Sequence, residues 1–166
     1  WIAEIKFTRS PGLARDLGRL LAARLAAAGA APKGEKWIVV PVASAWRRRV
    51  ARGVDHAGAI AEGVSRGLGV PLVRALRASA RPSQRSVPVS RRRANVAGAF
   101  RRRRGVSLEG RTVILVDDVR TTGATLGAAA WALVRPRAGG ARSVWAATLA
   151  VAADPWRGAH AGTEEG

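Results

Sequence analysis

The sequence contains no cysteine, no methionine and no tyrosine in its 166 residues. Without cysteine there can be no disulfide framework and no thiolate metal site, which is compatible with a cytoplasmic protein. No apolar run approaches the length of a membrane-spanning helix and no secretory signal pattern is present, so we expect no membrane association. The first residue is Trp1, and because methionine is missing throughout, we expect an upstream segment to precede this sequence.

Acidic residues are also scarce. The chain has 11 Asp and Glu against 29 Lys and Arg, which gives a net charge of +18. Two explanations stay open: the arginine-rich composition of a GC-rich genome, and an anionic partner such as nucleic acid. No zinc finger and no RNA-binding aromatic pattern is present, so we expect any nucleic-acid binding to be weak and non-specific.

The length and the hydrophobic content, 48%, suit one compact domain with a sizeable core. Periodic apolar patterns continue as far as residue 151 and then stop. We therefore assign residues 1–151 to one domain and residues 152–166 to a C-terminal tail.

The clearest chemical pattern is Val113 to Thr125, which reads VILVDDVRTTGAT. Its first residues, Val113 to Val116, predict a strand buried on both faces, and the acids Asp117 and Asp118 follow at once. A loop of hydroxyls around a glycine comes next, and the apolar run Leu126 to Val134 predicts a helix. A strand that ends in carboxylates and turns into a helix N-terminus is typical of a site for a phosphorylated sugar.

Each residue type in this pattern suits a sugar phosphate. The carboxylates of Asp117 and Asp118 can accept hydrogen bonds from two neighbouring ribose hydroxyls. Gly123 lets the backbone approach a ligand closely or adopt a positive φ. Backbone N–H groups and threonine hydroxyls can hold the phosphate, and the predicted phosphate site comprises Thr121, Thr122, Gly123, Ala124 and Thr125. The alternative is a buried strand, a solvated acid turn and a helix without a ligand.

The other apolar patterns predict helices that alternate with strands. Leucines recur at helical spacing in Pro11 to Ala28, which predicts an amphipathic helix with Ser10 as its N-cap. The further predicted elements are a strand over Lys36 to Val42, a helix over Ala57 to Leu68, a strand over Val70 to Leu76, a β-ribbon arm over Gly98 to Gly105 and a strand over Ser143 to Val151. This order predicts an α/β fold whose parallel central sheet is flanked by helices.

Two arginine-rich segments interrupt these elements. The first, Ala43 to Gly53, follows a predicted strand, where ligands of open α/β sheets bind. Its arginines could grip a pyrophosphate, and the candidate residues are Ser44, Arg47, Arg48 and Arg52. The alternative, which the sequence supports equally well, is a basic loop that is exposed to solvent and binds no ligand. The second segment, Arg77 to Asn95, is long and polar, and loops of this length are usually functional or disordered.

The stretch VILVDDVRTTGAT resembles the phosphoribosyl pyrophosphate (PRPP) binding motif of type I phosphoribosyltransferases, and the whole chain resembles their ComF branch. Lys6-Phe7 is similar to the family's Lys-Phe/Tyr pair, and Arg52-Gly53 to the start of its Arg-Gly-Phe-Asn-Gln motif. The second arginine-rich segment and the residues after it are similar to a further motif of the family, a Gln followed by Arg-x-x-Asn-Val-x-Gly-Ala-Phe. The matching residues are Gln84, Arg92, Asn95, Val96, Gly98, Ala99 and Phe100.

Two departures from the family stand out. Asp55-His56 replaces Asn-Gln, which leaves the role of that helix start open, and we interpret His56 as a surface or helix-start residue. The family's amino-terminal zinc ribbon of four cysteines is absent. Either the ribbon precedes Trp1 or the chain is a relative without one.

The resemblance implies a type I phosphoribosyltransferase-like fold and a glycosyltransferase whose acceptor is unknown. It implies PRPP as ligand, catalytic roles for Asp117 and Asp118, and Mg²⁺ held indirectly by these two acids while it bridges to the pyrophosphate. It further implies a flexible loop that closes over the leaving group and contains Gln84, Arg92 and Asn95. A non-catalytic PRPP-binding regulator and a basic accessory factor in DNA uptake remain alternatives. Assembly as a homodimer stays open.

Overall fold

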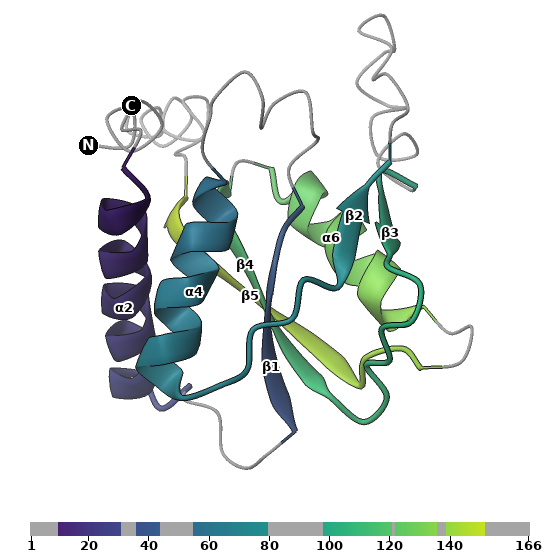
Figure 1. The fold of residues 1–166 in the computed structure, drawn as a ribbon, viewed down its shortest axis with the longest axis horizontal. Helices are drawn as coiled ribbons and strands as arrows, with labels where there is room; N and C mark the ends of the chain where they lie inside the picture. The colour runs from purple at the N-terminus through teal and green to yellow at the C-terminus, as the bar shows by residue number, and fades with distance from the viewer. Residues whose placement is uncertain are drawn as a thin grey trace, which may run out of the picture.

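The computed structural model describes residues 10–30, 36–43, 55–79, 98–120, 122–135 and 139–151. Its elements, drawn in Figure 1, are α2 (Pro11–Ala27), β1 (Trp37–Pro41), α4 (His56–Leu68), β2 (Leu76–Ala78), β3 (Phe100–Arg102), β4 (Thr112–Arg120), α6 (Ala124–Val134) and β5 (Ser143–Val151). All three predicted helices are confirmed, with ends that differ by one or two residues. None of the described helices is both long enough and apolar enough to cross a bilayer.

The central sheet has three parallel strands in the order β1-β4-β5. Its register joins Val39 to Ile114 and Ile114 to Trp145. The predicted α/β class with a parallel sheet is therefore confirmed. The predicted ribbon is confirmed as well, because β2 and β3 form a separate antiparallel pair that starts from Leu76 opposite Arg102.

The strand predicted over Val70 to Leu76 is wrong. Within it, Leu72 forms a single bridge to Val39 of β1, and only the last residue, Leu76, belongs to a strand, β2. The Val39 N–H donates to the Pro71 carbonyl and the Val73 N–H donates to the Val39 carbonyl, both at 2.8 Å. The parallel ladder does not extend beyond this bridge, because Pro71 has no N–H to donate on one side of it and Pro41 of β1 has none on the other. Regular pairing resumes only in β2, against β3.

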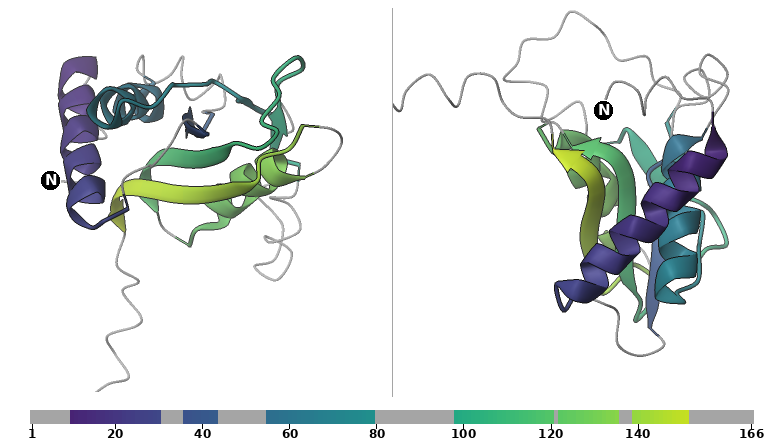
Figure 2. Two further views of the ribbon diagram at one scale, coloured as in Figure 1. Left: turned by 90° about the horizontal axis from the view of Figure 1, so that it is seen from below. Right: turned by 90° about the vertical axis from the view of Figure 1, so that its left-hand side faces the viewer.

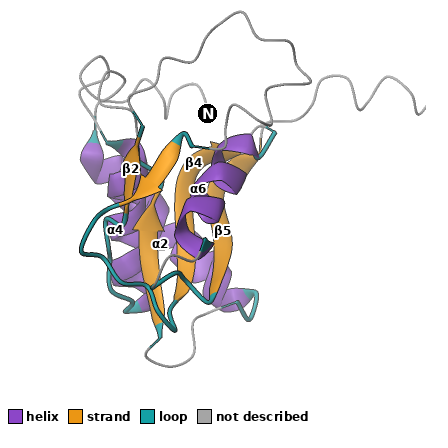
Figure 3. Cartoon of the chain, turned by 90° about the vertical axis from the view of Figure 1, so that its right-hand side faces the viewer, coloured by secondary structure: helices purple, strands orange, loops and turns teal. Residues whose placement is uncertain are grey.

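β1 and the first half of β4 bury both faces, as their continuous apolar runs predict, whereas most residues of β5 are half-buried or exposed. Alternate residues of β1 and β4 enter two hydrophobic clusters on opposite sides of the sheet. The cluster on the α6 side includes Ile38, Val40, Val113, Leu115, Leu126, Ala129 and Leu133. The cluster on the α2 and α4 side includes Ala14, Val39, Ile60, Val64, Ile114, Val116 and Ala147. Figure 2 and Figure 3 show the resulting layers, with helices on both faces of the sheet.

The buried face of α2 differs from the prediction. Its helix begins as expected, because the Ser10 hydroxyl accepts from the Leu13 N–H at 3.4 Å. The fully buried residues, however, are small ones: Ala14, Gly18 and Ala22. Leu13 and Leu20 remain 44% and 60% exposed. The reason is the close crossing of α2 over α4, which only residues with little or no side chain permit.

Candidate functional site

The carboxyl ends of β1, β4 and β5 meet at one edge of the sheet because the three strands are parallel. The helices α4 and α6 follow β1 and β4 and both begin at this edge, at the top of the view in Figure 1. Open α/β sheets bind ligands outside the carboxyl ends of their strands. The predicted site residues that the structure describes all lie at this edge.

The acid pair lies within β4 rather than in a turn after it. β4 continues to Arg120 because β5 still pairs with it, from Asp117 opposite Thr148 to Arg120 opposite Val151, whereas β1 ends opposite Val116. The Asp118 N–H donates to Asp117 Oδ1 at 3.0 Å, and the Val119 N–H donates to Asp118 Oδ1 at 2.8 Å. These bonds hold both half-buried carboxylates close to the backbone. The acids are therefore positioned by a paired strand, which makes their orientation more rigid than a turn would.

The start of α6 is open to an anion. Its N-cap residue, Gly123, has a φ of 77° and no side chain that could accept from the first turn. The Ala124 N–H donates to the Thr122 hydroxyl at 3.4 Å, and both Thr122 and Thr125 are exposed. N–H groups of a first helical turn without a side-chain cap favour an anionic ligand. The arrangement thus suits a phosphate, as the sequence predicts.

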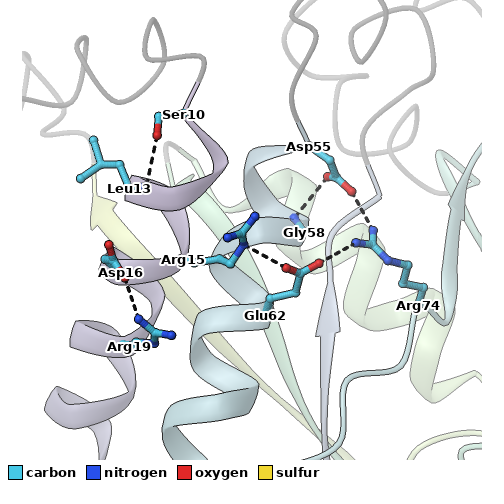
Figure 4. A network of polar contacts seen from close by, with 9 residues as sticks. All are labelled: Ser10, Leu13, Arg15, Asp16, Arg19, Asp55, Gly58, Glu62 and Arg74. Carbon is cyan, nitrogen blue, oxygen red and sulfur yellow. Dashed lines mark hydrogen bonds and ion pairs between the residues drawn. The ribbon is translucent and has the colours of Figure 1, made fainter.

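The start of α4 is held by a polar network that the sequence did not reveal (Figure 4). Asp55 is the N-cap: its Oδ1 accepts from the Gly58 N–H at 3.2 Å and its Oδ2 accepts from Arg74 Nη1 at 2.7 Å. Glu62 forms ion pairs with Arg74 at 3.5 Å and with Arg15 of α2 at 3.3 Å. Asp55 therefore caps the helix and binds Arg74, and Glu62 extends the network from Arg74 to α2. An Asp before an apolar helical run predicts such a cap. No pattern near Asp55 in the sequence predicts its ion pair with Arg74, because the two residues are far apart in the chain.

His56 is the first residue of α4, which confirms a helix-start position but not a surface one. Its side chain is buried, with 8% of its surface exposed. Its Nδ1 atom has no hydrogen-bond partner in the part of the chain that the structure describes. Buried polar atoms usually have a hydrogen-bond partner, so this nitrogen is an exception within the described residues.

Several predicted residues lie outside the described part of the chain. They are Thr121 of the phosphate loop, Ser44, Arg47, Arg48 and Arg52 of the segment after β1, and Gln84, Arg92 and Asn95 of the segment between β2 and β3. Their roles stay predictions. The described elements on either side of the first arginine-rich segment both lie at this edge, because β1 ends there and α4 begins there.

Comparison with known proteins identifies the family of the domain. A family model of the phosphoribosyl transferase domain matches residues 50–159. A solved structure described as the allosteric regulatory enzyme of purine biosynthesis superposes with a TM-score of 0.49 at 18% identity, over 89% of this chain and 30% of that one. No curated protein matches the chain.

Proposed function

Because the chain belongs to the phosphoribosyl transferase domain family, we propose that it binds PRPP at the carboxyl edge of its sheet and transfers the 5-phosphoribosyl group to an acceptor. The observation that carries this proposal is the acid pair on β4 beside the uncapped start of α6. We assign the chain to the ComF type on the strength of the sequence patterns around Lys6-Phe7 and Gln84 to Phe100.

In this proposal, the charge of each part of the site decides which part of PRPP binds there. The 5-phosphate lies on Thr121 to Thr125, where the α6 dipole and first-turn N–H groups stabilise negative charge. The ribose hydroxyls donate to Asp117 and Asp118, which only accept when ionised. The arginines of the segment after β1 bind the pyrophosphate.

The carboxylates of Asp117 and Asp118 also suit Mg²⁺, because this ion prefers oxygen donors and keeps several of its waters. Two half-buried carboxylates beside the ligand are a sufficient protein contribution for an ion that binds largely through substrate phosphates. When bound, Mg²⁺ supplies positive charge to the departing pyrophosphate.

Transfer breaks the bond between ribose C1 and a pyrophosphate oxygen, and pyrophosphate leaves with the electron pair. A nucleophilic atom of the acceptor forms the new bond to C1. The ribose carries positive charge between these events, and Asp117 and Asp118 stabilise it electrostatically while they hold the sugar in place. A PRPP-binding regulator would share all of these contacts, so turnover with an acceptor distinguishes the enzyme from the regulator.

Replacing Gly123 by valine tests the phosphate loop. The substitution places a branched side chain at a φ of 77° and in the path of the phosphate, so we expect PRPP to bind about tenfold more weakly or worse. Gly110→Val is the matched control, because Gly110 has a φ of 67° but lies in the turn before β4, at the opposite edge of the sheet. Both variants keep the net charge.

Calorimetry with PRPP, ribose 5-phosphate and inorganic triphosphate, with and without Mg²⁺, gives the measurement. PRPP should bind in a Mg²⁺-dependent way, and ribose 5-phosphate more weakly because it lacks the pyrophosphate contacts. If triphosphate binds as well as PRPP, or if Gly123→Val binds like the parent chain, the site is only a basic surface and the proposal fails.

The charge leads to a separate prediction about nucleic acid. Arg101, Arg103 and Arg104 are exposed and supply charge without a base-reading element. DNA should therefore bind weakly, with log K falling by about 0.9 per log unit of salt for each phosphate contact on duplex DNA. A salt titration of fluorescently labelled duplexes measures this slope. Tight, sequence-selective binding at physiological salt would instead favour the accessory factor in DNA uptake.

A further inference from the structure

A third carboxylate lies near the acid pair at the carboxyl edge of the sheet. Asp55 is the N-cap of α4, which begins at this edge. Ala59 and Ile60, one turn into the helix, belong to the same hydrophobic cluster as Val116, which directly precedes Asp117. The start of α4 therefore lies beside the part of β4 that carries the acid pair, and Asp55 lies near the ligand that this site is proposed to bind.

An additional negative charge at this edge would repel an anionic ligand. The structure offsets the charge of Asp55 with Arg74, whose Nη1 donates to Asp55 Oδ2 at 2.7 Å. A glycine leaves the room for this pair. A Cβ atom at Gly58 would collide with the Asp55 carboxylate and would lie 3.0 Å from Arg74 Nη1. The first turn of α4 is thus shaped to hold the carboxylate together with its guanidinium partner.

The pair is also held from its far side. Glu62, two turns along α4, lies 3.5 Å from Arg74 Nη2 and 3.3 Å from Arg15 Nε of α2. The charges alternate in sign from Asp55 through Arg74 and Glu62 to Arg15, as Figure 4 shows, so the network as a whole is neutral. Asp55 is its least exposed member, with 23% of its side chain accessible against 35% to 45% for the others. Solvent therefore screens the charge of Asp55 least, and the pairing with Arg74 matters most there.

We propose that Arg74 is a positioning residue for PRPP binding: it neutralises Asp55 and holds this carboxylate on the first turn of α4, so that no unpaired negative charge remains beside the ligand. The inference rests on the proposed function. Because Arg74 acts through Asp55, removing Arg74 alone weakens binding, whereas removing both charges does not. If the pair only supported the fold, losing both partners would be no better than losing one.

Calorimetry of the full chain with Mg-PRPP at low ionic strength tests the proposal. Arg74→Gln should weaken binding about fivefold or more, because it leaves the Asp55 carboxylate unpaired. Arg74→Lys keeps the charge and should bind like the parent chain. The double variant Asp55→Asn/Arg74→Gln should recover the parental affinity, because Asn still caps the helix and carries no charge.

Arg15→Gln is the matched control. Arg15 and Arg74 both pair with Glu62 and are similarly exposed, and either substitution removes one positive charge, but Arg15 makes no ion pair with Asp55. Arg15→Gln should therefore leave the affinity unchanged. Two trends identify charge as the cause of the loss in Arg74→Gln. The loss should be smaller for ribose 5-phosphate, which carries less negative charge than PRPP, and it should shrink as the salt concentration rises. Altered packing of α4 would produce neither trend.

A parent chain that does not bind Mg-PRPP would overturn the proposed function and this inference together. If the parent chain binds and Arg74→Gln binds equally well, only the inference is wrong. It is also wrong if the double variant stays as weak as Arg74→Gln, or if Arg15→Gln weakens binding to the same extent. Thermal unfolding shows whether each variant keeps its fold. Should Arg74→Gln unfold, Asp55→Asn decides instead: it leaves the charge of Arg74 unopposed and should bind PRPP more tightly than the parent, and unchanged affinity would overturn the inference.

Discussion

Gly18→Ala is expected to lower the free energy of unfolding by about 2 kcal/mol or more, although alanine forms helices more readily than glycine. A Cβ atom at Gly18 would lie 2.1 Å from the Ile60 carbonyl oxygen of α4. The same holds in reverse, because a Cβ at Gly63 would lie 2.0 Å from the Arg15 carbonyl oxygen of α2. Backbone atoms cannot rotate away as side chains do, so the two helices must separate. Gly63→Ala should therefore destabilise the chain to a similar extent.

Gly127→Ala is the control for helix propensity. Gly127 lies inside α6, and a Cβ there would meet nothing within 4 Å. This variant should raise the stability by up to about 1 kcal/mol. Urea unfolding of all three variants measures the differences. If Gly18→Ala and Gly63→Ala are as stable as Gly127→Ala, then α2 and α4 do not cross as closely as described.

The double variant Gly18→Ala/Gly63→Ala gives a further test of the crossing. One movement of α2 away from α4 relieves both clashes, so the combined loss should be smaller than the two single losses added together. Additive losses would mean that the glycines act at independent sites.

Asp117→Asn and Asp118→Asn should each weaken PRPP binding by about 1.5–3 kcal/mol, the contribution of a charge-assisted hydrogen bond. The fold should be unaffected, because an Asn Oδ1 can still accept the backbone bonds that Asp118 and Val119 donate. Stability and affinity are thus expected to change independently, which separates a role in binding from a role in the strand.

Asp16→Asn is the matched control for charge. It makes the same change in net charge on the exposed surface of α2, where Asp16 pairs with Arg19 at 2.8 Å. Calorimetric titration with Mg-PRPP should show parental affinity for this control and weak binding for both β4 variants. Parental affinity in Asp117→Asn and Asp118→Asn would show that these acids do not hold the ribose.

The sequence predicted those structural features that depend on residues close together in the chain. Continuous apolar runs identify β1, β4 and β5, and in β1 and the first half of β4 the run is apolar because both faces are buried. The N-cap Ser10 and the positive φ of Gly123 could be predicted because each depends on a single residue, through its side chain or its lack of one. The order of strand, acids, hydroxyl loop and helix identified the site motif for the same reason: all of its parts are adjacent in the chain.

The tertiary structure decided the features that depend on distant residues. The crossing of α2 and α4 buries Ala14, Gly18 and Ala22 and leaves two leucines exposed, because the distance between helices is set by glycines in both of them. β4 includes its acids because β5 continues beside them, a pairing that no local pattern encodes. The place of β5 beside β4 likewise depends on which strands meet, and periodicity within a strand carries no information about its neighbours.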